Sequence, residues 1–133
     1  MNTSEYKTID ELRLAYSKGQ REFEDWDFEE DESAEGMNLS GVIFKNCFLF
    51  LNFRNTNLTN SIFINCNLKT ADFSGANLEN GLIRNCSVES TMFNGANTKG
   101  FRFEENYCYG ATTKPGDFEK IFKNSDVFYE GDN

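Results

Sequence analysis

The chain has 133 residues and a mass of 15.3 kDa, which is the size of one folded domain, so we expect a single domain. It contains no histidine, which removes the most common general base and excludes Ser-His-Asp and Cys-His catalysis. The formal charge of −9 is concentrated near the N-terminus, where residues 1–36 hold 12 acidic and 4 basic side chains. This charge disfavours direct contact with nucleic acid or an anionic membrane, because both are bound through Lys and Arg.

The sequence carries no signal for membrane insertion, export or metal binding. No apolar run approaches the roughly 18 residues of a membrane span, and the first residues lack the layout of a signal peptide. We therefore expect a cytoplasmic protein with no membrane association. The four cysteines at positions 47, 66, 86 and 108 form no CxxC pair. We expect reduced thiols and no metal or other cofactor.

The first predicted element is an N-terminal helix within residues 1–20. Thr8 and Glu11 have the spacing of a capping box, and Gly19 is placed to end the helix. An apolar face is formed by four residues at helical spacing: Ile9, Leu12, Ala15 and Tyr16.

A strongly acidic stretch follows this helix. Residues 22–35 contain nine acidic side chains and no basic one, and the segment DESAEG at 31–36 is predicted to be an insertion. One interpretation is a solvated loop that keeps this end of the protein from aggregating. A second is a weak divalent-cation site built from Asp25, Asp27, Glu29 and Asp31. A third is a docking patch for a cationic partner, made of Glu24, Asp25, Asp27, Glu29, Glu30 and Asp31.

From residue 37 the chain repeats with a period of five. The third residue of each quintet is large and apolar in thirteen of fifteen cases, and the first is small through the centre of the chain. One large and one small interior position per five residues fit neither a helix nor a plain alternating strand. The best matches to A(D/N)LXX are ADFSG at 71–75, ANLEN at 76–80 and ANTKG at 96–100.

This pattern resembles the pentapeptide-repeat family over residues 37–110, and REFED and WDFEE at 21–30 extend it. The resemblance implies an all-β solenoid, a right-handed quadrilateral β-helix with four quintets and twenty residues per coil. We expect about four coils over residues 21–110. The spacing of 20 between Cys66 and Cys86 supports this period, and the quintet CFLF is one residue short. The predicted core consists of Phe53, Leu58, Phe63, Leu68, Phe73, Leu78, Ile83 and Phe93.

Both ends of such a solenoid need caps, because they expose unpaired strand edges. The N-terminal helix is suited to one end. Residues 111–133 are assigned to the other end, where Pro115 is placed to start a short helix whose apolar residues would cover the last coil: Phe118, Ile121 and Phe122.

The outward positions contain one apolar group. Ile43, Ile62 and Leu82 occupy the second positions of one column and Ile64 a fourth position, with Phe48 and Phe50 around the corner. Clustered apolar residues on a surface predict a patch that something covers. A terminal segment of the chain, a second copy of the chain and another protein all remain open as the covering element.

The sequence therefore predicts a non-catalytic module for protein–protein interaction, with an unidentified protein partner. The alternative comes from the family resemblance, since some of its members mimic DNA, bind type II topoisomerases such as gyrase and confer quinolone resistance. Such members carry acidic charge along a longer rod. Here residues 37–111 hold 5 acidic and 6 basic side chains, so this alternative is disfavoured.

Overall fold

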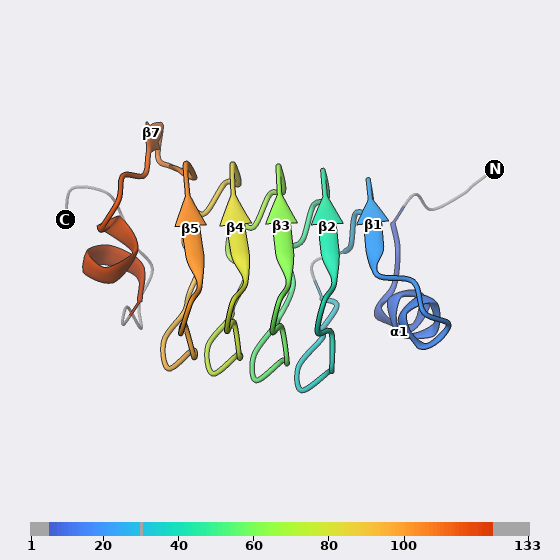
Figure 1. Ribbon diagram of the computed structural model, residues 1–133. Coiled ribbons are helices and arrows are strands. Elements are labelled where there is room, and N and C mark those ends of the chain that lie inside the picture. Colours follow the sequence, from blue (N-terminus) through green and yellow to red (C-terminus); the bar gives the residue numbers. More distant parts are fainter. Residues whose placement is uncertain (1–5, 30, 124–133) are drawn as a thin grey trace.

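The computed structural model describes residues 6–29 and 31–123, which form a parallel β-solenoid (Figure 1). One side of the solenoid is a sheet whose five short strands are stacked in chain order. They are β1 (Glu22–Glu24), β2 (Ile43–Lys45), β3 (Ile62–Ile64), β4 (Leu82–Arg84) and β5 (Arg102–Glu104). Every pair of neighbours is parallel, so the chain makes four turns between β1 and β5.

The register of this sheet confirms the predicted period. The central residues of the five strands face each other as Cα partners and are 21, 19, 20 and 20 residues apart: Phe23, Phe44, Phe63, Ile83 and Phe103. We call residues 21–41, 42–60, 61–80 and 81–100 coils 1 to 4. The departures from twenty lie in coils 1 and 2.

The interior of the solenoid is filled by the central residues of the quintets. All eight predicted core residues are fully buried: Phe53, Leu58, Phe63, Leu68, Phe73, Leu78, Ile83 and Phe93. The rings of Phe53 and Phe73 stack with centroids 4.9 Å apart, and those of Phe73 and Phe93 at 5.3 Å. Phe63 meets Phe73 edge-on at 5.6 Å. Offset and edge-on pairs are the arrangements that aromatic quadrupoles favour, so stacked Phe rings pack closely along this part of the interior.

The corners explain the Asn and Gly that close many quintets. Asn55, Asn65 and Asn85 adopt positive φ values of 57 to 58°, a conformation that Asn and Gly reach most easily. At Gly75 the φ is +71°, and a Cβ there would overlap Oδ1 of Asn55 in the coil before it. The small residue is therefore required by the neighbouring coil as well as by the turn.

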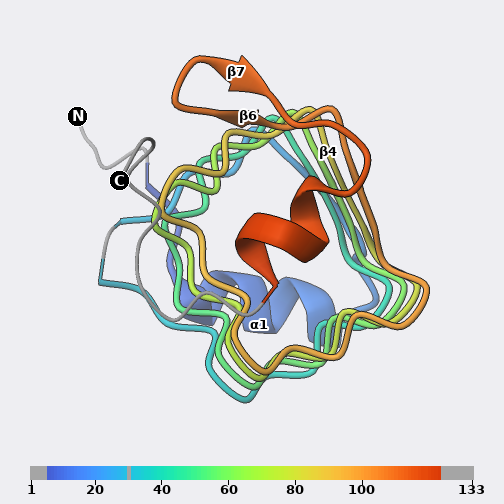
Figure 2. The same cartoon turned by 90° about the vertical axis from the view of Figure 1, so that its left-hand side faces the viewer.

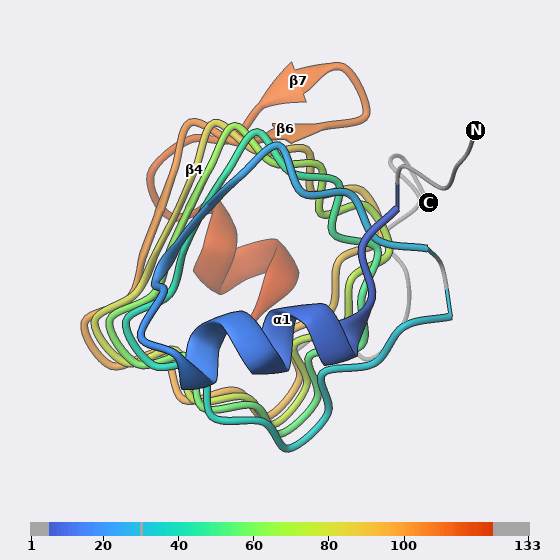
Figure 3. The same cartoon turned by 90° about the vertical axis from the view of Figure 1, so that its right-hand side faces the viewer.

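Helix α1 (Ile9–Ser17) crosses the N-terminal opening of the solenoid (Figure 3). The predicted capping box is present, with the Thr8 side chain accepting from the Glu11 N–H at 3.1 Å and the Thr8 N–H donating to the Glu11 carboxylate at 2.8 Å. Leu12 is fully buried and Ile9 nearly so. The predicted N-terminal cap is confirmed.

The C-terminal opening is closed by a hairpin and a helical turn (Figure 2). Strands β6 (Tyr107–Cys108) and β7 (Ala111–Thr112) pair antiparallel. Strand β6 still follows the coils, since Tyr107 pairs in parallel with Ser87, and β7 turns back outside them (Figure 2). The turn η1 (Phe118–Phe122) then packs into the opening, where Phe118 lies 5.1 Å from the Phe93 ring. The predicted helical cap is therefore confirmed, although it follows a hairpin that the repeat pattern did not predict.

The hairpin begins where a buried Asn106 replaces the cysteine of earlier coils. Its Oδ1 accepts the Cys86 N–H at 2.8 Å, and its Nδ2 donates to the Ile83 carbonyl at 3.0 Å. Its backbone N–H donates to the Thr113 hydroxyl at 3.0 Å, and its carbonyl accepts the Thr113 N–H at 2.6 Å. Asn106 thus joins the last coil to the returning strand.

The acidic insertion expected at residues 31–36 is smaller in the structure. Ser33 pairs with Asn52 of coil 2, and the Ala34 side chain is fully buried in the position that a Phe or Leu takes in other quintets. Residues 32–36 are therefore an ordinary side of coil 1, hidden from the sequence pattern by the small size of Ala34. The remaining irregularity is one extra residue between Asp27 and Ser33, where coil 1 bulges from the outline of the others (Figure 3).

No helix within the part of the chain that the structure describes is long and apolar enough to cross a membrane.

Candidate interaction surfaces

The four residues of the predicted apolar interface lie together on the outer face of the sheet. Ile43, Ile62 and Leu82 are successive partners in the parallel ladder, and Ile64 is two residues after Ile62 on the same face of β3. Ile43, Ile62 and Ile64 are half-buried, whereas Leu82 is only 7% exposed. We call these four side chains the sheet patch. They lie flush with the surface, so a flat partner surface would fit them better than a protruding one.

Charged side chains frame the sheet patch. Lys45 Nζ is 2.9 Å from the Glu22 carboxylate, and this hydrogen bond raises the pKa of Lys45. At the far end Arg102 pairs with Glu104 at 3.6 Å. Exposed ion pairs of this kind add little to stability. An apolar centre inside a polar rim is, however, the usual anatomy of a protein interface.

The described terminal elements do not cover the sheet patch. Helix α1 lies across one end of the solenoid and η1 across the other, whereas the sheet forms a side (Figure 1). Of the three open alternatives for the cover, a described terminal helix is therefore excluded. The terminal residues 1–5 and 124–133, which lie outside the described residues, a second copy of the chain and another protein all remain open.

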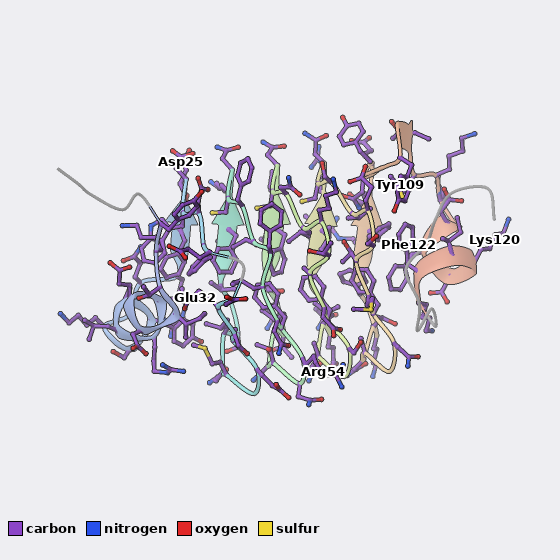
Figure 4. All side chains as sticks on the ribbon, turned by 180° about the vertical axis from the view of Figure 1, so that it is seen from behind. Asp25, Glu32, Arg54, Tyr109, Lys120 and Phe122 are labelled. Atoms are coloured by element: carbon purple, nitrogen blue, oxygen red, sulfur yellow. The ribbon has the colours of Figure 1, made fainter. Side chains whose placement is uncertain are left out.

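The predicted acidic patch is spread around coil 1. Glu24 accepts a hydrogen bond from Asn46 Nδ2 at 3.3 Å at the end of β1, and Asp27 accepts the Phe48 N–H at 3.1 Å on the next side. Figure 4 shows Asp25 at one edge of the rod and Glu32 well away from it, beside α1. Glu29 and Asp31 are exposed. Glu30 lies outside the described residues.

This spread weakens the cation-site interpretation. Among residues 6–29 and 31–123, no three His, Cys, Asp or Glu side chains are grouped so as to hold a metal ion. For the docking interpretation, the relevant part of the acidic patch is Asp31, because it lies beside a groove that the sequence analysis did not predict.

This groove is open and has a volume of about 690 Å³. It runs along the rod at the corner that Phe50 and Leu51 form in coil 2. Phe50 and Leu51 of coil 2 and Met92 of coil 4 line it, with Asp31 and Glu32 at one end and Lys69 toward the other. Phe48 lies beside Phe50, with ring centroids 5.9 Å apart, and is 48% exposed. The short quintet CFLF was the signal for this groove in the sequence.

The cysteines at positions 47, 66 and 86 form one interior column. The Cys66 N–H points at Cys86 Sγ at 3.4 Å, and the Trp26 N–H points at Cys47 Sγ at the same distance. A hydrogen bond with Cys66, followed by burial, raises the pKa of Cys47. The contact with Cys47 acts in the opposite direction on Cys66, but Cys86 and burial raise the pKa of Cys66 to about 12. The hydrogen bond with Cys66 lowers the pKa of Cys86. Buried thiols in such a column act as small core residues.

Comparisons with known proteins agree with this architecture. The model of the pentapeptide repeat region matches residues 37–112. A trypsin-treated variant of QnrB1, a plasmid-mediated fluoroquinolone resistance protein, superposes with a TM-score of 0.62 and 25% identity over 66% of this chain and 47% of QnrB1. This chain therefore spans about half of that relative's length.

A second solved structure matches nearly end to end. The pentapeptide repeat protein alr5209 from Nostoc PCC 7120 covers 92% of this chain and 98% of its own length, with a TM-score of 0.50 and 20% identity, which bears on the fold alone. No curated protein sequence matches. Because the family model spans more than half of the residues and the coils have the expected form, the chain belongs to the pentapeptide-repeat family.

Proposed function

We propose that this protein is a non-catalytic interaction module that holds a partner protein against the outside of a rigid solenoid. The observation that carries the proposal is the sheet patch, an apolar centre on a flat sheet with ion pairs at its edges. The described terminal helices leave this face uncovered. Apolar residues in such a setting are commonly retained because a partner covers them.

The packed core supports this role. The Phe73 ring stacks on Phe53 at 4.9 Å and on Phe93 at 5.3 Å, and the backbone of each coil is bonded to the coils beside it. Outward side chains are therefore held at fixed spacings before a partner arrives. A surface ordered in advance pays less conformational entropy on binding, which favours affinity from a small contact area.

A pair of double variants tests the proposal. Ile62→Asp with Ile64→Asp places two charges in the sheet patch. Asn57→Asp with Asn77→Asp adds the same charge to coils 2 and 3 on another side, and keeps the Oδ1 atoms that cap Thr59 and Glu79 at 3.1 Å. We expect tagged wild type and the Asn57/Asn77 variant to retain at least one common protein from lysate that the Ile62/Ile64 variant loses. The proposal is wrong if all three retain the same proteins.

The partner can be a second copy of the chain. Light scattering of the purified wild type separates the two cases, because self-association gives a mass above 15.3 kDa that falls on dilution. If the wild type is a dimer, the Ile62/Ile64 variant should be a monomer with unchanged circular dichroism. A monomeric wild type directs attention to another protein.

A second candidate function is protection of a type II topoisomerase from fluoroquinolones, which the likeness to QnrB1 favours. The carboxylates after residue 60 argue against a DNA mimic, since three of them lie beside arginines. Asp72 is 3.1 Å from Arg54, Glu104 is 3.6 Å from Arg102, and Glu105 is 4.0 Å from Arg84. A gyrase supercoiling assay with and without a quinolone tests this function. Drug protection or inhibition at micromolar protein supports it, and no effect at high concentration eliminates it.

A further inference from the structure

We propose that the groove over Phe50 and Leu51 is a docking site for an extended segment of a partner protein. The segment is four to five residues long, with an apolar side chain at its centre and a basic residue at the end near coil 1. This inference rests on the proposed function and names a second contact surface with its partner chemistry.

The groove is produced by the number of residues at one corner of successive coils. The corner can be measured between the residues that form β-bridges on either side of it. In coil 1 these residues are Asp27 and Ser33, six positions apart, and in coil 2 they are Phe48 and Asn52, four positions apart. In coil 3 they are Asn67 and Asp72, at the regular distance of five positions. The groove lies where this long corner of coil 1 is stacked beside the short corner of coil 2.

The coil 2 corner gives the recess an apolar floor, whereas the corresponding corner of coil 3 is polar. In coil 3 the corner ends with Lys69 and Thr70, whereas the short corner of coil 2 presents Phe50. Thr70 has a φ of 63° and is the left-handed residue of the regular corner in coil 3. Coil 2 has no residue equivalent to Thr70, because its corner is one residue shorter. Phe48 occupies the outward position that Asn67 has in coil 3 and stays 48% exposed. Two aromatic rings at such positions supply a hydrophobic anchor site.

Charge at the ends of the groove sets the orientation of the ligand. Asp31 is exposed and lines the coil 1 end of the groove. Its neighbour Glu32 already accepts a hydrogen bond from the Ile9 N–H at 2.7 Å. Residues 22–35 carry nine acidic side chains and no basic one, and the nearby Lys7 ammonium lies over the Trp26 ring at 4.8 Å, so this end carries a net negative charge. Lys69 stands on the other side of Phe50, where the Asp72 carboxylate is already paired with Arg54 at 3.1 Å. A ligand with its basic residue toward Asp31 is therefore favoured over the reverse orientation.

The length of the ligand follows from the spacing of the coils. Parallel coils lie about 4.8 Å apart, so the groove from coil 1 to coil 4 runs for roughly 14 Å. An extended peptide rises about 3.3 Å per residue, and four to five residues therefore span it.

The test begins with a library of random heptapeptides displayed on phage and selected on the immobilised full chain. We expect enriched sequences with Lys or Arg one or two positions from Leu, Ile, Met or Phe. Synthetic fluorescent copies are then titrated against wild type and variants at 50 mM and 500 mM NaCl. Binding should weaken at high salt, since part of it is electrostatic.

The decisive variant inserts a threonine between Phe50 and Leu51, which restores a five-residue corner without removing any native side chain. It should weaken peptide binding at least tenfold with no loss of thermal stability. Asp31→Asn should weaken binding several-fold at 50 mM NaCl. Leu14→Ser, which removes a 56% exposed apolar side chain from α1, is the matched control and should leave binding unchanged. If the insertion lowers the melting temperature, Phe50→Ser takes its place.

The proposal is overturned if selection enriches no sequence, if the enriched peptides lack the basic or the apolar residue, or if the corner variant binds them like wild type. Its failure is separable from that of the proposed function. A chain that binds no peptide, yet still loses a partner through Ile62→Asp with Ile64→Asp, is an interaction module without a docking groove.

Discussion

Replacing Phe73 by alanine tests whether the aromatic stack holds the solenoid together. The Phe73 side chain is fully buried and contacts three other rings, those of Phe53, Phe63 and Phe93, at centroid distances of 4.9 to 5.6 Å. Truncating a buried Phe to Ala costs about 3 to 5 kcal/mol, because burial is lost and a cavity remains. Since the ring also loses three aromatic partners, we expect the upper half of this range.

The same substitution on the surface is the control. Phe48 is 48% exposed and touches the Phe50 ring edge-on, so Phe48→Ala removes the same atoms but opens no cavity. We expect it to cost about 1 kcal/mol or less, since surface substitutions have small effects. Comparing the two variants separates the effect of packing from that of residue type.

Guanidinium unfolding measures both changes. Circular dichroism follows the strands, and fluorescence follows Trp26, the single tryptophan, whose ring lies 4.8 Å from the Phe23 ring in coil 1. Coinciding transitions indicate that the coils unfold as one unit. A loss of about 4 kcal/mol is a large share of the stability of an ordinary domain. If Phe73→Ala costs no more than Phe48→Ala, the stack is not the main source of stability.

Three further substitutions test other parts of the argument. Asn106→Ala leaves two buried hydrogen-bonding groups unpaired and should cost about 2 kcal/mol or more in denaturant unfolding, whereas Asn106→Cys, the residue of earlier coils, should cost less. Gly75→Ala should destabilise the fold more than Gly41→Ala does, since both have φ near +75° but only the first Cβ meets a neighbour, Asn55; equal losses would refute this. Burial raises the pKa of Cys108 to about 11, so the unfolded chain releases this proton first as the pH rises. Stability should therefore fall between about pH 9 and pH 11, and Cys108→Ser should reduce that fall; an unchanged pH profile would contradict the assignment.

The periodic part of the structure could be predicted from the sequence because each coil repeats the same solution to the same packing problem. Phe53, Phe73 and Phe93 are twenty residues apart and stack in the interior, and the capping box at Thr8 depends only on local spacing. The hairpin at the C-terminal end could not be predicted this way. Its origin is Asn106, whose side chain bonds to two residues of the preceding coil. The period places Asn106 at an interior position but does not show which backbone groups its amide reaches.

For the candidate sites too, the periodic features could be predicted from the sequence and the others could not. Grouping of the sheet patch followed from the period, because Ile43, Ile62 and Leu82 have equivalent places in successive quintets. Their limited exposure did not follow, since it depends on the neighbouring side chains of the same sheet. The acidic patch had no period to order it, and its members lie on different sides of coil 1, with Glu24 bonded to Asn46 at the end of β1 and Asp27 bonded to Phe48 on the next side.

The groove depends on two irregularities of opposite sign that meet at one corner. The surplus residue near Asp31 and the missing residue after Phe50 are separated by about one coil, so each looks like a local defect when the quintets are read in order. Stacking brings them side by side, and the sheet returns to a register of twenty in coil 3. A rod that only needed to fold would gain from a regular corner, with a left-handed residue like Thr70 and polar side chains toward water. Instead coil 2 presents two phenylalanines there, which is the reason we assign this corner to binding rather than to the frame.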